Sequence, residues 1–191
     1  MNTNIQIPHS LSLNDSEDTR IRNGVDAYKY IKDNLNVFDY AFKSVFIVFY
    51  GLYLNDGMRK KLMESMDILQ THVKEKPHIS TIDEGIALFK TIRQELKELC
   101  RQDEVSFSSK FVHTIWSDFP ILDNKIKKYF SIDDAEFYQH SEETIKELYI
   151  AYKDYLATKE GKKNVEEFKE RYKCDDISDI KIIDFLIWVK Q

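Results

Sequence analysis

The residues whose types and spacing could do chemistry lie between Ser106 and Phe130, in the stretch SFSSKFVHTIWSDFPILDNKIKKYF. Hydroxyl, amine and imidazole side chains recur there at steps of three and four, which places them on one face of a short helix. These polar residues are Ser106, Ser109, Lys110 and His113. An apolar set occupies another face, with Phe107, Phe111 and Ile115. The pattern predicts a helix with one face in the core and a second face that could touch a ligand.

An acidic residue follows the turn at Pro120. Asp123 stands where its carboxylate can cap a helix that begins at Asn124. That helix is basic, and basic side chains attract phosphate by displacing counterions. Its lysines, Lys125, Lys127 and Lys128, are predicted contacts for nucleic acid. The alternatives are a plain helix cap for Asp123, a solvated surface for the lysines and for Lys110, and for His113 either a solvated helix face or a hydrogen bond to the backbone.

This arrangement resembles the second half of the core of the helix-hairpin-helix DNA glycosylases. In that superfamily a helix rich in small residues is followed by a proline-containing turn, and an Asp then caps the next helix. The corresponding residues are Ser108, Ser109 and Lys110 in the helix, Phe119, Pro120, Ile121 and Leu122 in the turn, and Asp123 at the catalytic position. The likeness is closer to uncharacterised bacterial helical proteins with an SKxxH…FPIxD pattern, whose ending is similar to IKIIDFLIWVK.

The resemblance implies a site and a reaction. Asp123 would stabilise the positive charge that develops on a sugar as its base departs, or activate the attacking nucleophile, with the base in a neighbouring pocket. Lys110 and His113 would complete the catalytic group, and Ser109 would join the three lysines in contacting DNA or RNA. Phe107 stands where bifunctional members carry a nucleophilic Lys, which implies a monofunctional N-glycosylase-like hydrolase. The stretch Arg101 to Val105, which corresponds to the family's glycine-rich hairpin, contains no Gly.

Composition and missing motifs exclude several other functions. The formal net charge of −5 speaks against non-specific binding to phosphate backbones, so any nucleic-acid site must be local. The chain has no G-x-x-x-x-G-K-[ST], G-x-G-x-x-G, H-E-x-x-H or G-x-S-x-G. Its five His are scattered, without Cys or carboxylates at ligand spacing. We therefore expect no metal and no cofactor.

The 191 residues predict one all-α domain, a compact orthogonal multi-helix bundle of about eight helices over residues 23–191, behind a polar N-terminal arm, 1–22. Only five Gly and three Pro are present, too few for the turns of an all-β fold. Helices are expected over about 25–35, 58–74, 81–101, 106–116, 124–130, 133–158, 164–172 and 180–190, with Gly161 ending the longest of the later ones. The aromatic segment 37–54 is expected to be the central buried helix. A strand is the alternative for the final apolar run.

No stretch is long enough for a membrane span, and the N-terminus lacks the basic start and apolar core of a secretion signal. Cys100 and Cys174 have no disulfide or zinc spacing. These features predict a soluble cytoplasmic protein with no membrane partner. Two functions remain open: a divergent, glycosylase-like nucleic-acid protein, with or without catalysis, and a non-enzymatic helical interaction module of a bacterial defence or mobile-element system.

Overall fold

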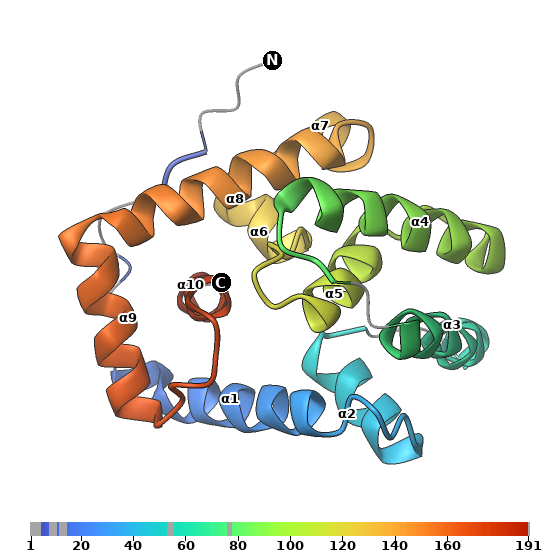
Figure 1. The fold of residues 1–191 in the computed structure, drawn as a ribbon, viewed down its shortest axis with the longest axis horizontal. Coiled ribbons are helices and arrows are strands. Elements are labelled where there is room, and N and C mark those ends of the chain that lie inside the picture. The colour runs from blue at the N-terminus through green and yellow to red at the C-terminus, as the bar shows by residue number, and fades with distance from the viewer. Residues whose placement is uncertain (1–4, 8–10, 12–14, 53–55, 76–77, 191) are drawn as a thin grey trace.

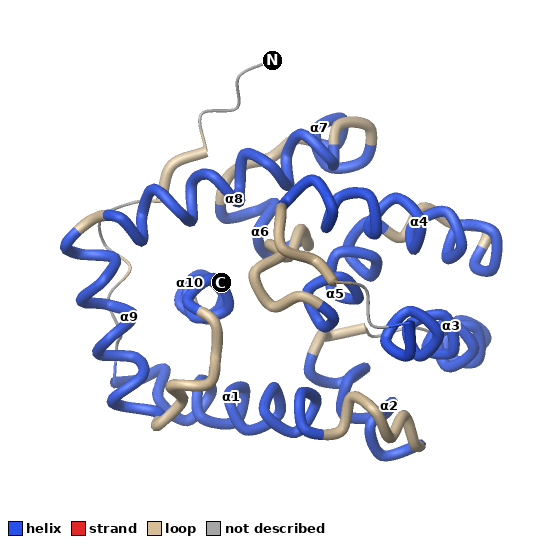
Figure 2. Tube along the Cα trace, viewed as in Figure 1, coloured by secondary structure: helices blue, strands red, loops and turns tan. Residues whose placement is uncertain are grey.

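Helices and the loops between them make up the described chain, and Figure 2 shows no strand in that part. The computed structural model describes residues 5–7, 11, 15–52, 56–75 and 78–190, with the backbone alone at 56–60 and 62. After a 3-10 helix at Asp15–Glu17 come α1 (Asp18–Asp33), α2 (Tyr40–Phe49), α3 (Asp56–Glu75), α4 (Ile82–Cys100), α5 (Val105–Ile115), α6 (Asn124–Tyr129), α7 (Asp134–Tyr138), α8 (Ser141–Ala157), α9 (Lys159–Tyr172) and α10 (Asp179–Val189). The predicted all-α bundle is confirmed. The strand alternative is wrong, because α10 is helical.

The centre of the bundle is α10, which Figure 1 shows end-on inside a ring of other helices. It contacts α1, α6, α8 and α9. Eight of its eleven residues are buried, and so are nine of the eleven residues of α5. The sequence of α10 is apolar on nearly all sides, which is typical of a helix inside a fold, whereas α5 buries polar side chains together with its apolar ones.

The aromatic segment is not the central helix that its composition predicted. The helix in 37–54 covers only Tyr40–Phe49, and it lies at the edge of the bundle. The side chains of Val37, Tyr40 and Val48 are 55%, 73% and 63% exposed. Only three of its ten residues are buried, Phe42, Phe46 and Ile47. Residues 53 and 54 of the prediction lie outside the described residues.

The helix expected over 133–158 is interrupted. Gln139 and His140 separate α7 from α8, and α8 ends at Ala157 because Thr158 caps α9. The Thr158 hydroxyl accepts the Gly161 N–H at 2.9 Å. Gly161 therefore does not break a helix but lies in the first turn of α9, where an added Cβ would overlap the carbonyl oxygen of Tyr155.

The first helix begins earlier than its apolar pattern indicated. It starts at Asp18 instead of about Val25, so the last residues of the expected arm are helical. Ile21 is fully buried, and the buried Leu11 accepts a hydrogen bond on its carbonyl from Asn164 at 2.9 Å. Arg171 of α9 pairs with Asp18 at 2.9 Å. Contacts with the distant α9, which no local pattern encodes, hold this end of the chain.

Local signals predicted other elements correctly. Thr81 and Glu84 form the expected capping box at the start of α4. Met66, Leu69 and Val73 form the buried stripe of α3. None of the helices in the described ranges is both long and apolar enough to span a bilayer.

Candidate active site

The turn between α5 and α6 is held by a buried hydroxyl. Ser109 Oγ donates to the Ser106 carbonyl at 2.9 Å and accepts the Leu122 N–H at 3.1 Å, and its side chain is inaccessible to solvent. One residue later, Asp123 caps α6 as predicted, because its Oδ1 accepts the N–H groups of Lys125 and Ile126 at 3.0 and 3.1 Å. Ser109 thus holds the turn that carries Asp123 and does not reach the surface, where we expected it to contact nucleic acid.

Asp123 lies in the wall of a cavity of about 420 Å³. The walls come from α1, α2, α5, α6 and α10. Four cationic and two acidic side chains line it: Arg20, Lys110, Lys125, Lys181, Asp123 and Asp184. This volume falls within the usual range of small-molecule sites. A charged cavity inside an apolar bundle is the place to look for chemistry.

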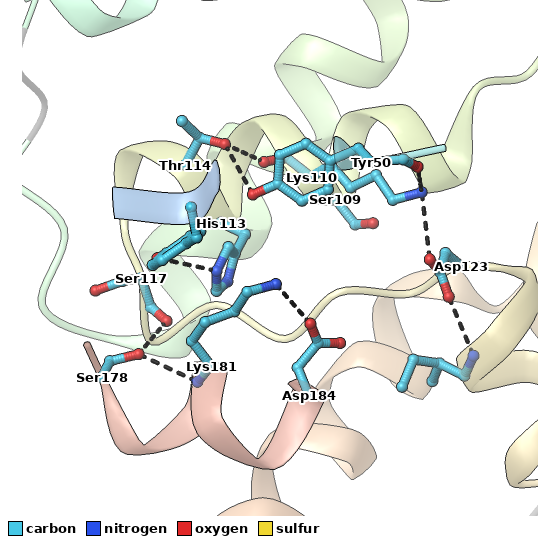
Figure 3. Close-up of polar contacts among 12 residues, drawn as sticks. Tyr50, Ser109, Lys110, His113, Thr114, Ser117, Asp123, Ser178, Lys181 and Asp184 are labelled. Atoms are coloured by element: carbon cyan, nitrogen blue, oxygen red, sulfur yellow. Dashed lines mark hydrogen bonds and ion pairs between the residues drawn. The ribbon is translucent and has the colours of Figure 1, made fainter. Parts of the chain in front are cut away.

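Lys110 is the charge partner of Asp123. Its ammonium lies 3.2 Å from Asp123 Oδ2, and the two side chains are only 6% and 18% exposed. Lys110 Nζ also donates to the Tyr50 carbonyl at 3.1 Å (Figure 3). It donates to Ser106 Oγ at 3.0 Å as well. An ammonium has three N–H donors, so these three contacts use all of them. Lys110 therefore holds Asp123 in place and has no donor left for a ligand.

The surroundings of Asp123 favour its charged form. Burial alone would raise the pKa of this carboxyl group, but the Lys110 ammonium and the N–H groups of Ile126 and Lys125 outweigh burial and lower the pKa below its usual value. A carboxylate accepts about four hydrogen bonds. Asp123 takes two N–H groups and one ammonium, which leaves capacity for a contact with a ligand in the cavity.

A second buried ion pair comes from α10 (Figure 3). Lys181 Nζ lies 2.6 Å from Asp184 Oδ2, and the side chains are 3% and 13% exposed. The Lys181 ammonium also lies 4.7 Å from the ring centroid of Phe185 and 5.1 Å from that of Phe49, distances at which an aromatic face attracts a cation. Aromatic rings thus replace part of the water that this ammonium lacks.

The pKa values of the two carboxyl groups in the cavity are shifted in opposite directions from their ordinary values. Burial raises the pKa of Asp184, the charge of Asp123 adds to the rise, and Lys181 opposes it. The pKa of Asp123 is lowered. Paired carboxyl groups with such different surroundings can divide acid-base work, one remaining a charge and the other exchanging a proton. The arrangement can therefore stabilise a developing cation and accept a proton beside it.

His113 does not line the cavity that holds Lys110 and Asp123. Its Nδ1 lies 2.7 Å from the Phe119 carbonyl and its Nε2 lies 3.3 Å from the Tyr28 hydroxyl. A neutral ring satisfies both partners, with Nδ1–H donating and Nε2 accepting. The side chain is buried, and burial, with the charge of Lys181, lowers the pKa of His113 well below its ordinary value. In this structure His113 fixes the turn from inside the core.

We expect stability to reflect this buried imidazole. Below pH 6.5, the ordinary pKa of histidine, the unfolded chain binds a proton that the folded chain does not, so stability is lost as the pH falls. Between pH 7.5 and 5.5 the wild type should lose about 1 kcal/mol more unfolding free energy than His113→Gln. Urea denaturation at both pH values measures the difference. Parallel losses in the two proteins would contradict the assignment.

The three lysines of α6 lie in three different environments. Lys125 lines the cavity, with its ammonium 4.3 Å from the ring centroid of Trp188. Lys127 pairs with Asp134, and Lys128 is exposed. They do not form one track along the helix. Of the residues expected to bind nucleic acid, Lys125 is the one that the structure brings to Asp123.

The sequence reasoning missed Lys181, Asp184 and Arg20. The first two are the only charged residues in the apolar run Ile180 to Val189, and their spacing of three places them on one helix face. A charged pair inside a helix expected to be buried was the available signal. Arg20 was missed because residues 1–22 were assigned to a polar N-terminal arm without a function.

Within the described ranges, no group of three or more His, Cys, Asp or Glu side chains is placed to hold a metal ion. Comparison of the chain with protein-family models, with curated proteins and with solved structures gives no match. The function is therefore inferred from the cavity that Asp123 lines.

Proposed function

We propose that the cavity binds a nucleoside unit of nucleic acid and that the chain hydrolyses its N-glycosidic bond, in the manner of a monofunctional glycosylase. One observation carries the proposal: a carboxylate, Asp123, is kept ionised by Lys110 in the wall of a cavity of about 420 Å³. A negative charge fixed beside a sugar favours the departure of the base, because positive charge develops on the sugar carbon. The likeness of the α5–α6 turn to the glycosylase core supports the same role for Asp123.

The reaction needs a charge stabiliser and a proton acceptor. As the C–N bond breaks, its electron pair leaves with the base, and Asp123 stabilises the sugar cation. Water then adds to that carbon and gives its proton to Asp184, which passes it to the departed base, so no proton is gained or lost. A raised pKa makes Asp184 the better proton acceptor of the two carboxylates. Lys110 contributes by keeping Asp123 ionised and in place, and Ser109 and His113 contribute by holding the turn that carries Asp123.

Asp123→Asn tests the proposal directly. Asn preserves the helix cap while the charge is lost, and Lys110 keeps its hydrogen bonds to Tyr50 and Ser106. Urea denaturation of the variant verifies that it is folded under the assay conditions. Base release from a panel of oligonucleotides with damaged bases should fall at least about 100-fold, the effect typical of removing one group that stabilises developing charge. Asp118→Asn is the matched control, because Asp118 lies outside the cavity lining and pairs with Lys153 at 3.8 Å. It should release bases like the wild type.

Three outcomes of this assay would decide between functions. Equal release by wild type and Asp123→Asn would remove Asp123 from catalysis. Wild-type binding of the oligonucleotides at low salt without release would indicate a glycosylase-like fold that has lost catalysis. If the wild type neither releases bases nor binds the oligonucleotides, the proposal is overturned and the interaction module is favoured. The exposed apolar side chains of Val37, Tyr40 and Val48, on and beside α2, offer a surface for such a module.

A further inference from the structure

Two cations meet at one aromatic ring in the wall of the Asp123 cavity. The Arg20 guanidinium carbon lies 4.1 Å from the ring centroid of Trp188, and the Lys125 ammonium lies 4.3 Å from it. They come from α1 and α6, and the ring comes from α10. All three residues line the cavity. Arg20 is exposed and Lys125 partly buried, so this cluster is the solvent-facing part of the site.

These two cations differ from the deeper pair because neither forms an ion pair with an acidic side chain in the described part of the chain. Lys110 and Lys181 each pair with a carboxylate of the cavity. Among the described residues, no acidic side chain lies within ion-pair distance of Arg20 or Lys125. Burial lowers the pKa of Lys125, repulsion from Arg20 adds to the effect, and the charges of Asp123 and Asp184 oppose it only in part. An anion placed between them would relieve that repulsion.

The excess positive charge of the cavity is concentrated at its solvent-facing end. Its deep ion pairs are formally neutral, so the excess positive charge lies with Arg20 and Lys125. Trp188 holds both cations at distances where the ring face attracts them, so their positions are set before a ligand arrives. Guanidinium and ammonium groups are also the usual protein partners of phosphate. A ligand with a neutral or cationic sugar end and an anionic end fits this arrangement.

We propose that Arg20 and Lys125 form a phosphate subsite, so that the nucleoside unit in the Asp123 cavity carries its phosphate at Trp188. This inference rests on the proposed function and specifies that the nucleoside unit is recognised through one phosphate. A longer phosphate track does not extend along α6, because Lys127 is paired with Asp134. The net charge of −5 likewise favours recognition of one phosphate over wrapping of a polymer.

Calorimetric titration with a set of nucleosides, their 5′-monophosphates and a short single-stranded oligonucleotide tests the subsite. The monophosphates should bind the wild type at least tenfold more tightly than the nucleosides. Arg20→Met and Lys125→Met keep the apolar stem against Trp188 but remove the charge, so each should abolish most of that preference. Lys128→Met, which changes an exposed lysine on the same helix outside the cavity lining, is the matched control.

The different ligands in this titration distinguish failure of the phosphate subsite from failure of the proposed function. Equal affinity of the wild type for nucleoside and monophosphate would overturn the subsite and leave the proposed function standing. Binding of inorganic phosphate that both Met variants lose, without binding of any nucleoside, would support the subsite and overturn the proposed function. Oligonucleotide binding tighter than monophosphate binding, with a salt slope of several charges, would overturn the single-phosphate substrate.

Discussion

Lys110→Met is expected to lower the free energy of unfolding by about 3 kcal/mol, because it leaves Asp123 as a buried carboxylate without its counter-charge. The value lies at the lower end for broken buried pairs, since Asp123 stays 18% exposed and keeps both N–H groups of α6. The variant also loses the hydrogen bond from Lys110 to the Tyr50 carbonyl, which ties the end of α2 to α5. Urea denaturation at pH 7 measures the loss.

Two further variants identify the cause. Lys128→Met removes an exposed lysine and should change stability by less than about 0.5 kcal/mol. In Lys110→Met, burial is expected to raise the folded-state pKa of Asp123 above the unfolded value, so stability relative to wild type should improve as the pH falls toward 4. Lys110→Met combined with Asp123→Asn should recover part of the loss at pH 7. A loss below about 1 kcal/mol for Lys110→Met would show that the pair contributes little.

Gly161→Ala is expected to destabilise the fold by about 3 kcal/mol or more, at or above the upper end for added methyl groups. The new Cβ would overlap the Tyr155 carbonyl oxygen and lie 3.2 Å from Thr158 Oγ1. The first obstacle is backbone, which cannot rotate away as a side chain can. The turn between α8 and α9 would have to open, weakening the hydrogen bond from the Gly161 N–H to Thr158. Thermal and urea unfolding measure the change.

Gly24→Ala is the matched control for Gly161→Ala. It adds the same methyl group inside helix α1, where the nearest atom is a ring carbon of Phe185 at 3.1 Å. That ring can shift slightly, and Ala gains up to about 1 kcal/mol over Gly from helix propensity. Gly24→Ala should therefore be close to neutral. Equal destabilisation by the two substitutions would show that backbone overlap at Gly161 is not the cause.

The parts of the fold that were predictable from sequence have local causes. A capping box at Thr81 and a cap at Asp123 require only nearby backbone N–H groups, so residue spacing located both. The break between α7 and α8 lies at Gln139 and His140, where no Gly or Pro marks it. The position of α2 at the edge of the bundle depends on competition with α5 and α10 for the centre. Such competition is settled by tertiary packing and leaves no trace in one helix.

The candidate site was likewise predictable only where its residues lie close together in sequence. Lys110 and Asp123 belong to one short stretch, and the structure brings them together, as the family resemblance implied. Asp184 reaches the cavity from α10, 61 positions after Asp123, and Arg20 reaches it from α1. Nothing near Asp123 in sequence points to either residue. His113 lies three residues after Lys110 on the same side of α5, but its ring contacts Tyr28 in the core and does not line the cavity.

The central position of α10 also has a consequence for biosynthesis. The ribosome makes this helix after α1, α6, α8 and α9, which pack around it. Until α10 emerges, those helices have no partner for their inner faces, and contacts such as that of Glu17 with Lys190 cannot form. A nascent chain of this kind exposes apolar surface until α10 emerges, and chaperones bind such surface. Because Asp184 and Trp188 arrive with α10, the binding cavity and the stable fold should appear in the same step.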